Sequence, residues 1–159
     1  AGEVEGIPMK AIEDIDTLIV GATDVGIALG AAVTAAESFE LGTVPIGGIR
    51  RNSLEVVREL ELPPYVIPVS GLCIGYPEHD PGQKPRLPKE AIYHEETYNK
   101  DLVPMLEKYN DIYAKYLAER NEGQREGTWT KTVASFYSKS YYHGVDEMLK
   151  QQKFPGGKE

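Results

Sequence analysis

The chain has 159 residues, enough for one domain with a buried core. Its net charge of −8 argues against nucleic acid or an anionic membrane as the main partner, since both attract positive charge. The single cysteine, Cys73, allows no internal disulfide and indicates a reducing compartment, the cytoplasm. Because Cys73 lies in an apolar run, we expect a small buried side chain and no catalytic thiol. The longest apolar stretch, Val25–Ala36, is shorter than the ~20 residues that span a bilayer.

The first third of the chain predicts an irregular approach followed by a buried helix. Residues 1–16 are rich in acids, and residues 17–20 suit either a buried strand or the start of a buried helix. From Asp24, a candidate cap, to Phe39 the sequence is apolar nearly all round, which is typical of a buried helix. Its small residues let another backbone approach closely, so we interpret it as the central helix of a domain or of a dimer interface.

A glycine pair, a short helix and a strand are predicted next. Gly47-Gly48 precedes a helix that Ser53 can cap and that ends by Pro63. Residues 65–74 are apolar on both faces, which favours a central strand. The four prolines in residues 77–88 predict a loop.

The last third predicts two helices. The first spans residues 102–120 and carries tyrosines at helical spacing, at positions Tyr109, Tyr113 and Tyr116. A polar break at 121–127 precedes Trp129, which we expect to anchor the next helix in the core. That helix spans residues 128–152 with an interruption near His143-Gly144, and residues 153–159 form a frayed tail. Residues 17–152 therefore constitute one domain, or part of one.

Three groups of residues are candidates for ligand binding. Gly47-Gly48 can present bare backbone N–H groups, with Arg50 close behind. Lys84 and Arg86 flank a proline in an extended segment and suit a phosphate. Arg120 and Arg125 border the polar break and could clamp a nucleotide phosphate. For each group, an ordinary loop with surface cations is the simpler interpretation from spacing alone. The three histidines are too scattered to predict a metal site.

Taken together and in order, these motifs resemble the oxygen-insensitive NADPH nitroreductase and FMN-dependent flavin reductase family. The resemblance extends from about residue 17 to about residue 150. The motifs that carry it are Ala35-Ala36-Glu37-Ser38, Leu41 to Arg50, Gly71 to Pro77, Lys84 to Pro88, His94-Glu95 and Thr128-Trp129.

The resemblance implies an α+β, nitroreductase-like fold, with an antiparallel or mixed sheet wrapped by helices. It also implies an intertwined homodimer with FMN at the subunit interface. The expected activity is ping-pong hydride transfer from NADPH or NADH to nitroaromatics, quinones or flavins. Because the flavin carries the chemistry, no catalytic side chain and no metal are expected.

By motif position, the resemblance implies a set of binding residues. The residues expected along the FMN ring are Pro45, Ile46, Gly47 and Gly48. Lys84 and Arg86 are expected on the FMN phosphate and ribityl chain. Arg120 is expected on the NAD(P)H phosphate, with Arg125 or Arg50 assisting.

One departure limits the resemblance. Relatives carry an N-terminal FMN-binding segment, and residues 1–16 do not resemble it. The expectation is therefore the C-terminal part of a subunit. The alternative is a non-catalytic flavin-binding or dimerisation module of the same fold.

Overall fold

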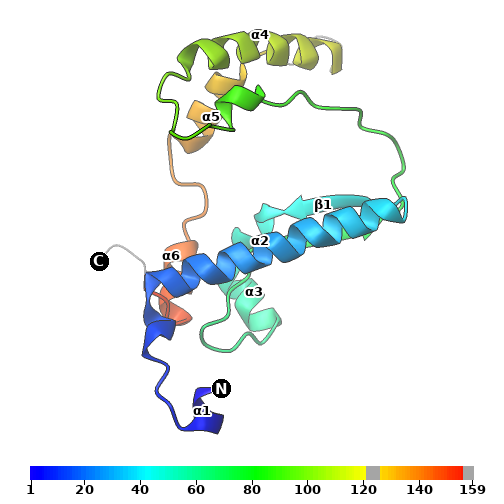
Figure 1. Ribbon diagram of the computed structural model, residues 1–159. Helices are drawn as coiled ribbons and strands as arrows, with labels where there is room; N and C mark the ends of the chain where they lie inside the picture. The colour runs from blue at the N-terminus through cyan, green and yellow to red at the C-terminus, as the bar shows by residue number, and fades with distance from the viewer. Residues whose placement is uncertain (121–125, 156–159) are drawn as a thin grey trace. The chain divides into compact units, whose positions relative to one another are not determined.

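The computed structural model describes residues 1–120 and 126–155 (Figure 1). They form two compact units, Ala1–His79 with Tyr142–Glu159 and Asp80–Tyr141. The elements of the first unit are α1 (Gly2–Glu5), η1 (Lys10–Glu13), α2 (Ile15–Ser38), β1 (Gly42–Ile46), η2 (Gly47–Arg50), α3 (Ser53–Glu59), β2 (Gly71–Gly75) and α6 (Val145–Gln151). The elements of the second unit are η3 (Lys89–Ala91), α4 (Val103–Arg120) and α5 (Trp129–Tyr137).

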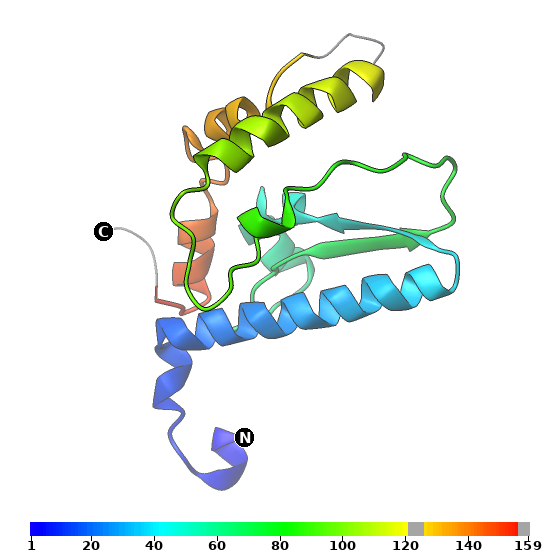
Figure 2. The same cartoon turned by 45° about the horizontal axis from the view of Figure 1, so that its top comes forward.

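The prediction that the long helix starts at Asp24 was wrong, whereas the helical alternative for residues 17–20 was correct. α2 begins at Ile15 and contains both the 17–20 run and Asp24, which is therefore no cap. The Thr23 hydroxyl donates to the Ile19 carbonyl at 2.8 Å, so this threonine stays within the helix by bonding back to the preceding turn. Figure 2 shows α2 alongside the strands of the same unit. Upstream of it, α1 and η1 lie within residues 1–16, for which the sequence predicts an irregular segment.

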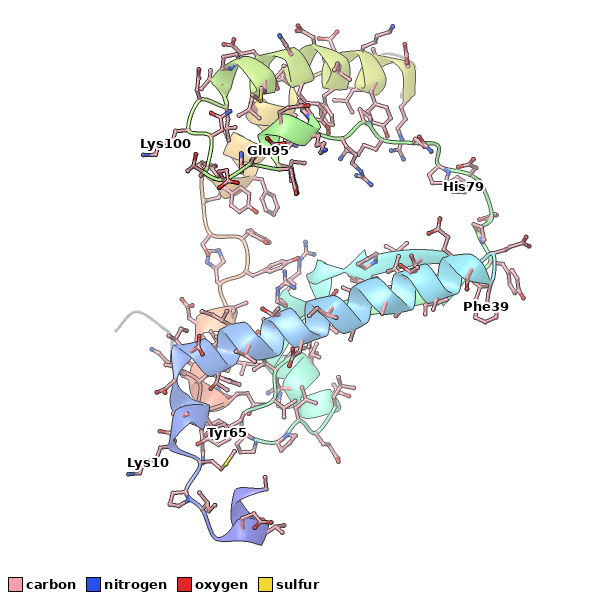
Figure 3. The ribbon with its side chains drawn as sticks, in the orientation of Figure 1. Lys10, Phe39, Tyr65, His79, Glu95 and Lys100 are labelled. Carbon is pink, nitrogen blue, oxygen red and sulfur yellow. The ribbon has the colours of Figure 1, made fainter. Side chains whose placement is uncertain are left out.

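α2 is not the buried helix that the sequence predicts. Ala36 is its one buried residue, and Phe39 just beyond its end is 74% exposed (Figure 3). A Cβ added at Gly26 or Gly30 would meet no atom within 4 Å. A 24-residue helix is ~36 Å long, and the described residues pack against only part of that length.

The length of α2 also corrects the prediction about membrane spans. α2 has 24 residues and contains an 18-residue stretch with a mean hydropathy of 1.8, so by length and composition alone it is long and apolar enough to cross a bilayer. The same properties occur in core helices of soluble proteins.

The sheet has two antiparallel strands. β1 pairs with β2 from Gly42 opposite Gly75 to Ile46 opposite Gly71. The prediction of a central strand over residues 65–74 was wrong, because only Gly71–Gly75 is extended into the ladder. With one neighbouring strand, β2 leaves Ile74 51% exposed and Cys73 exposed, contrary to the expected burial of Cys73. Helices with a small antiparallel sheet make this an α+β fold, as predicted.

Polar side chains fasten α6 to the middle of the chain. Ser53 is 1% exposed and its hydroxyl donates to the Gly144 carbonyl at 3.2 Å, so it does not cap α3 as predicted. Asn52 is the N-cap residue of that helix. The side-chain amide of Gln152, 4% exposed, donates to the Val66 carbonyl at 2.9 Å and to the Leu62 carbonyl at 3.4 Å.

In the second unit, α4 has the predicted extent and packs on α5. Tyr109 on α4 is buried and meets the Trp129 ring edge-on at a centroid distance of 5.8 Å, so Trp129 joins α5 to α4 as expected, although it is half-buried and does not lie in the core. The Asn110 side chain accepts from the Thr130 amide at 3.0 Å and donates to its hydroxyl at 2.9 Å. The predicted helix 128–152 is divided into α5 and α6, with the break near His143-Gly144 as expected.

We predict that Gln152→Met destabilises the protein by about 1–3 kcal/mol, because it leaves two backbone carbonyls without their donor. The free energy of unfolding in urea measures this loss. Gln151→Met is the matched control, since the neighbouring Gln151 is exposed and, among the described residues, its side chain donates to the Glu147 carboxylate within the same helix. The control should change stability by less than about 0.5 kcal/mol. Equal losses for the two variants would contradict the role of Gln152.

Candidate functional site

The predicted flavin-ring residues form the end of β1 and the start of η2. Pro45 and Ile46 close the strand, and Gly47 and Gly48 begin the 3-10 turn. Neither glycine adopts the left-handed backbone conformation. Glycine suits position 47 because it lacks a side chain: a Cβ at Gly47 would lie 3.3 Å from the Arg50 guanidinium. At Gly47 the Arg50 guanidinium therefore takes the place of a side chain, whereas Gly48 has more room, since its Cβ would meet no atom closer than 3.9 Å.

Arg50 links this turn to the segment before β2. Its guanidinium donates a short hydrogen bond to the Val69 carbonyl and lies over the Tyr142 ring at 5.7 Å from the centroid. A Cβ at Gly48 would lie 3.9 Å from the Tyr142 hydroxyl. Arg50 thus holds the Gly-Gly turn in place within its own unit.

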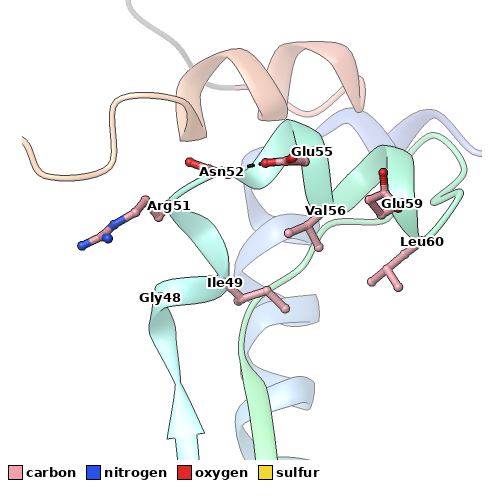
Figure 4. Close-up of a pocket in the computed structure, with 8 residues that line it drawn as sticks. All are labelled: Gly48, Ile49, Arg51, Asn52, Glu55, Val56, Glu59 and Leu60. Atoms are coloured by element: carbon pink, nitrogen blue, oxygen red, sulfur yellow. Dashed lines mark hydrogen bonds between the residues drawn. The ribbon is translucent and has the colours of Figure 1, made fainter.

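A cavity of about 490 Å³ opens beside this turn (Figure 4). Its lining combines the turn with one face of α3, and comprises Gly48, Ile49, Arg51, Asn52, Glu55, Val56, Glu59 and Leu60. The Asn52 amide donates to the Glu55 carboxylate at 3.1 Å. Glu55 and Glu59 were missed as candidates by the sequence reasoning, because acids one helical turn apart are ordinary on an exposed helix face.

The two predicted phosphate-binding cations line one groove in the second unit. This groove has a volume of about 620 Å³ and is bordered by Gln83, Lys84, Pro85, Arg86, Ile112, Lys115, Tyr116 and Glu119. Between the cations, the Pro85 carbonyl accepts a hydrogen bond from the Tyr109 hydroxyl at 2.7 Å. The Lys84 ammonium lies over the Tyr113 ring, 5.4 Å from its centroid. The extended segment is therefore fastened to α4 at Lys84 and at Pro85.

The charge on this groove is mostly positive. In the part of the chain that the structure describes, neither Lys84 nor Arg86 forms an ion pair, whereas the Lys115 ammonium lies 3.9 Å from the Glu119 carboxylate. Burial raises the pKa of the Tyr109 hydroxyl, the neighbouring Tyr113 raises it further, and the positive charge of Arg86 lowers it. The groove offers two unpaired cations to an anion.

Arg120, predicted on the NAD(P)H phosphate, is the last residue of α4. Its guanidinium lies 5.8 Å from the Tyr116 ring centroid and donates to the Tyr116 hydroxyl. Arg125 lies outside the described residues. Among residues 1–120 and 126–155, no cluster of three histidine, cysteine or acidic side chains could hold a metal ion.

The candidate residues thus fall into two groups. Pro45, Ile46, Gly47, Gly48 and Arg50 belong to the first unit. Lys84, Arg86 and Arg120 belong to the second. Each group is organised by contacts within its own unit.

Solved structures define the class of protein, an α+β protein of nitroreductase-like fold. The structure of B. megaterium NfrA2 matches with a TM-score of 0.94 and 45% identity, over 99% of this chain and 64% of that chain. The NfrA1 nitroreductase from B. subtilis matches with a TM-score of 0.90 and 34% identity, over 96% of this chain and 64% of that chain.

Sequence comparison finds a matching family domain and several relatives. The model of the nitroreductase family C-terminal domain matches residues 84–156. A protein of Bacillus subtilis strain 168 named FMN reductase [NAD(P)H] is 44% identical over 96% of this chain and 62% of its own length. The oxygen-insensitive NADPH nitroreductase of Salmonella typhimurium is 37% identical over 86% of this chain and 57% of its own length. Residues 84–156 therefore match the C-terminal domain of the nitroreductase family, and the chain spans less than two thirds of the length of these relatives.

We predict that Tyr109→Phe lowers the free energy of unfolding by about 1 kcal/mol at neutral pH, because the Pro85 carbonyl loses its donor. In the wild type, the raised pKa of Tyr109 means that the folded protein holds this proton more tightly than the unfolded chain. That contribution is full below the ordinary tyrosine pKa of about 10 and is lost as the pH rises through the folded value.

The pH dependence of urea unfolding measures this effect. Above pH ~10 the stability of Tyr109→Phe should fall less steeply than that of the wild type. Tyr137→Phe, which removes an exposed hydroxyl from α5, is the control for the loss of one tyrosine. Parallel curves for wild type and Tyr109→Phe would contradict the assignment.

Proposed function

We propose that this chain is part of an FMN-dependent NAD(P)H oxidoreductase that reduces nitroaromatics, quinones or free flavins by ping-pong hydride transfer. The observation that carries the proposal is the groove in which Lys84 and Arg86 lie on either side of Pro85, without ion pairs among the described residues. The names of the relatives support it, since they include an FMN reductase and an NADPH nitroreductase.

Lys84 and Arg86 are suited to the FMN phosphate. A guanidinium can donate two parallel hydrogen bonds to phosphate oxygens, and an ammonium adds a point charge. Because Tyr109 fastens Pro85, the backbone between the two cations is fixed before a ligand arrives. Less conformational entropy is then lost on binding.

Pro45, Ile46, Gly47 and Gly48 are suited to a flat ring. Pro45 and Ile46 are apolar, and the two glycines leave the backbone bare at the end of β1. A backbone N–H from Gly48 would donate toward the ring. When bound, FMN accepts and delivers the hydride, so the protein's share is binding, orientation and exclusion of water.

Arg120 is proposed for the phosphate of NADPH, with Arg50 and Arg125 as further candidates. NADH remains the alternative co-substrate. The small electron acceptor would bind beside the flavin ring.

We further propose a cytoplasmic homodimer that binds neither nucleic acid nor a membrane. The exposed apolar surface of α2 supports the dimer, because large exposed apolar patches mark interaction surfaces. The net charge of −8 disfavours nucleic acid and anionic lipid.

The test is flavin binding followed by turnover. We expect FMN fluorescence to be quenched on titration with the protein, and NAD(P)H to be oxidised when a quinone or nitroaromatic is added. Arg86→Ala should weaken FMN binding by about 10-fold or more, because a charge-assisted bond to phosphate is lost. Lys89→Ala is the matched control, since Lys89 lies over the Tyr93 ring and outside the groove.

Two outcomes would overturn the proposal. FMN binding that is equally strong in Arg86→Ala and wild type would exclude the phosphate role of the groove. FMN binding without any NAD(P)H oxidation would favour the alternative, a non-catalytic flavin-binding or dimerisation module.

A further inference from the structure

The aromatic face of α4 holds two cations from different parts of the chain. Tyr109, Tyr113 and Tyr116 follow one another at spacings of four and three residues, so they lie on one side of the helix. Their ring centroids are 6.0 Å and 6.2 Å apart along this row. Lys84 lies over the Tyr113 ring and Arg120 over the Tyr116 ring. The aromatic row therefore binds two positively charged side chains by cation–π contacts.

Tyr116 differs from the other two tyrosines in its surroundings. Tyr109 and Tyr113 are buried, whereas Tyr116 is half-buried and borders the groove that contains Lys84 and Arg86. Its ring and its hydroxyl both contact the Arg120 guanidinium, which is otherwise exposed at the end of α4. An arginine held at two points has fewer orientations than one that extends into solvent.

Arg120 is the cation on this stretch of α4 that contacts Tyr116, because the other nearby charges pair with each other. Glu119 and Lys115, also on this stretch of α4, pair with each other at 3.9 Å. Tyr116 accepts its hydrogen bond from Arg120, so the remaining guanidinium donors are directed elsewhere. A planar fork with several donors is suited to a phosphate group.

We propose that Tyr116 is a positioning residue that orients Arg120 toward a phosphate monoester of the nicotinamide nucleotide and so favours NADPH over NADH. This inference rests on the proposed function. Tyr116 does not touch the reacting atoms; it acts by restricting the guanidinium before the nucleotide binds. Removing the ring should therefore weaken binding of the additional phosphate and leave the rest of the nucleotide unaffected.

The test uses two probes that differ by that phosphate, adenosine 2′,5′-bisphosphate and adenosine 5′-monophosphate, titrated calorimetrically into the 159-residue chain. Wild type should bind the bisphosphate more tightly. Tyr116→Leu should raise the Kd of the bisphosphate about threefold to fivefold and leave that of the monophosphate unchanged. Tyr116→Phe keeps the ring and should recover most of the affinity.

A double-mutant cycle separates positioning from a general structural effect. In an Arg120→Ala background, Tyr116→Leu should cause no additional loss, because the group that it orients is gone. Tyr93→Leu is the matched control: Tyr93 is 65% exposed, carries Lys89 at 5.3 Å from its ring centroid, and lies outside the groove. Melting temperatures of all variants show whether each remains folded.

Three results would overturn the inference. They are equal weakening of both probes by Tyr116→Leu, additive losses in the cycle, and no preference of the wild type for the bisphosphate. If FMN binding and NAD(P)H oxidation persist while any of these occurs, only the role of Tyr116 fails. If flavin binding itself is absent, the proposed function fails first.

Discussion

The hydrogen bond from the buried Tyr109 hydroxyl to the Pro85 carbonyl organises the second unit. A tyrosine buried in an aromatic row needs a partner for its hydroxyl, and a proline-rich segment cannot form a regular ladder of its own. The Pro85 carbonyl supplies the acceptor that the Tyr109 hydroxyl needs, and the hydroxyl supplies a donor for that carbonyl. The same bond fixes the peptide that carries Lys84 and Arg86, so the position of the candidate phosphate site follows from a packing constraint on α4.

The first unit uses polar contacts in a similar way. Arg50 joins the Gly-Gly turn to the Val69 carbonyl, and Ser53 joins α3 to Gly144. Gln152 then ties the end of α6 to the segment that precedes β2. These bonds connect stretches far apart in the sequence, and each is made at the boundary of a helix or strand. The apolar core is small, with Met148 at 1% exposure its most buried large side chain.

α2 is the element whose observed exposure differs most from what its apolar sequence predicts. Its composition suits a buried helix, whereas the described residues cover little of it. A two-stranded sheet on one side cannot surround a helix of this length.

The sequence alone determined the elements that local chemistry dictates. The four prolines of residues 77–88 enforced a loop, the tyrosine spacing marked α4, and the order of the motifs indicated the family whose C-terminal domain matches residues 84–156. That Lys84 and Arg86 border the same groove was predictable, because both flank Pro85 in one extended segment. Arg50 was predictable as a candidate, but its bond to Val69 was not, since nothing local connects the two residues.

Only the tertiary structure decided which apolar residues are covered. The burial of Cys73 and of α2 was predicted wrongly, because hydrophobicity states what a side chain favours and not which neighbours it finds. The sequence predicts that Ser53 caps a helix, yet its hydroxyl donates to the carbonyl of Gly144, which lies 91 residues further along the chain. The stacking of Lys84 on Tyr113 likewise depends on a loop and a helix meeting in space. Long-range pairing of this kind leaves no periodic signal in a single sequence.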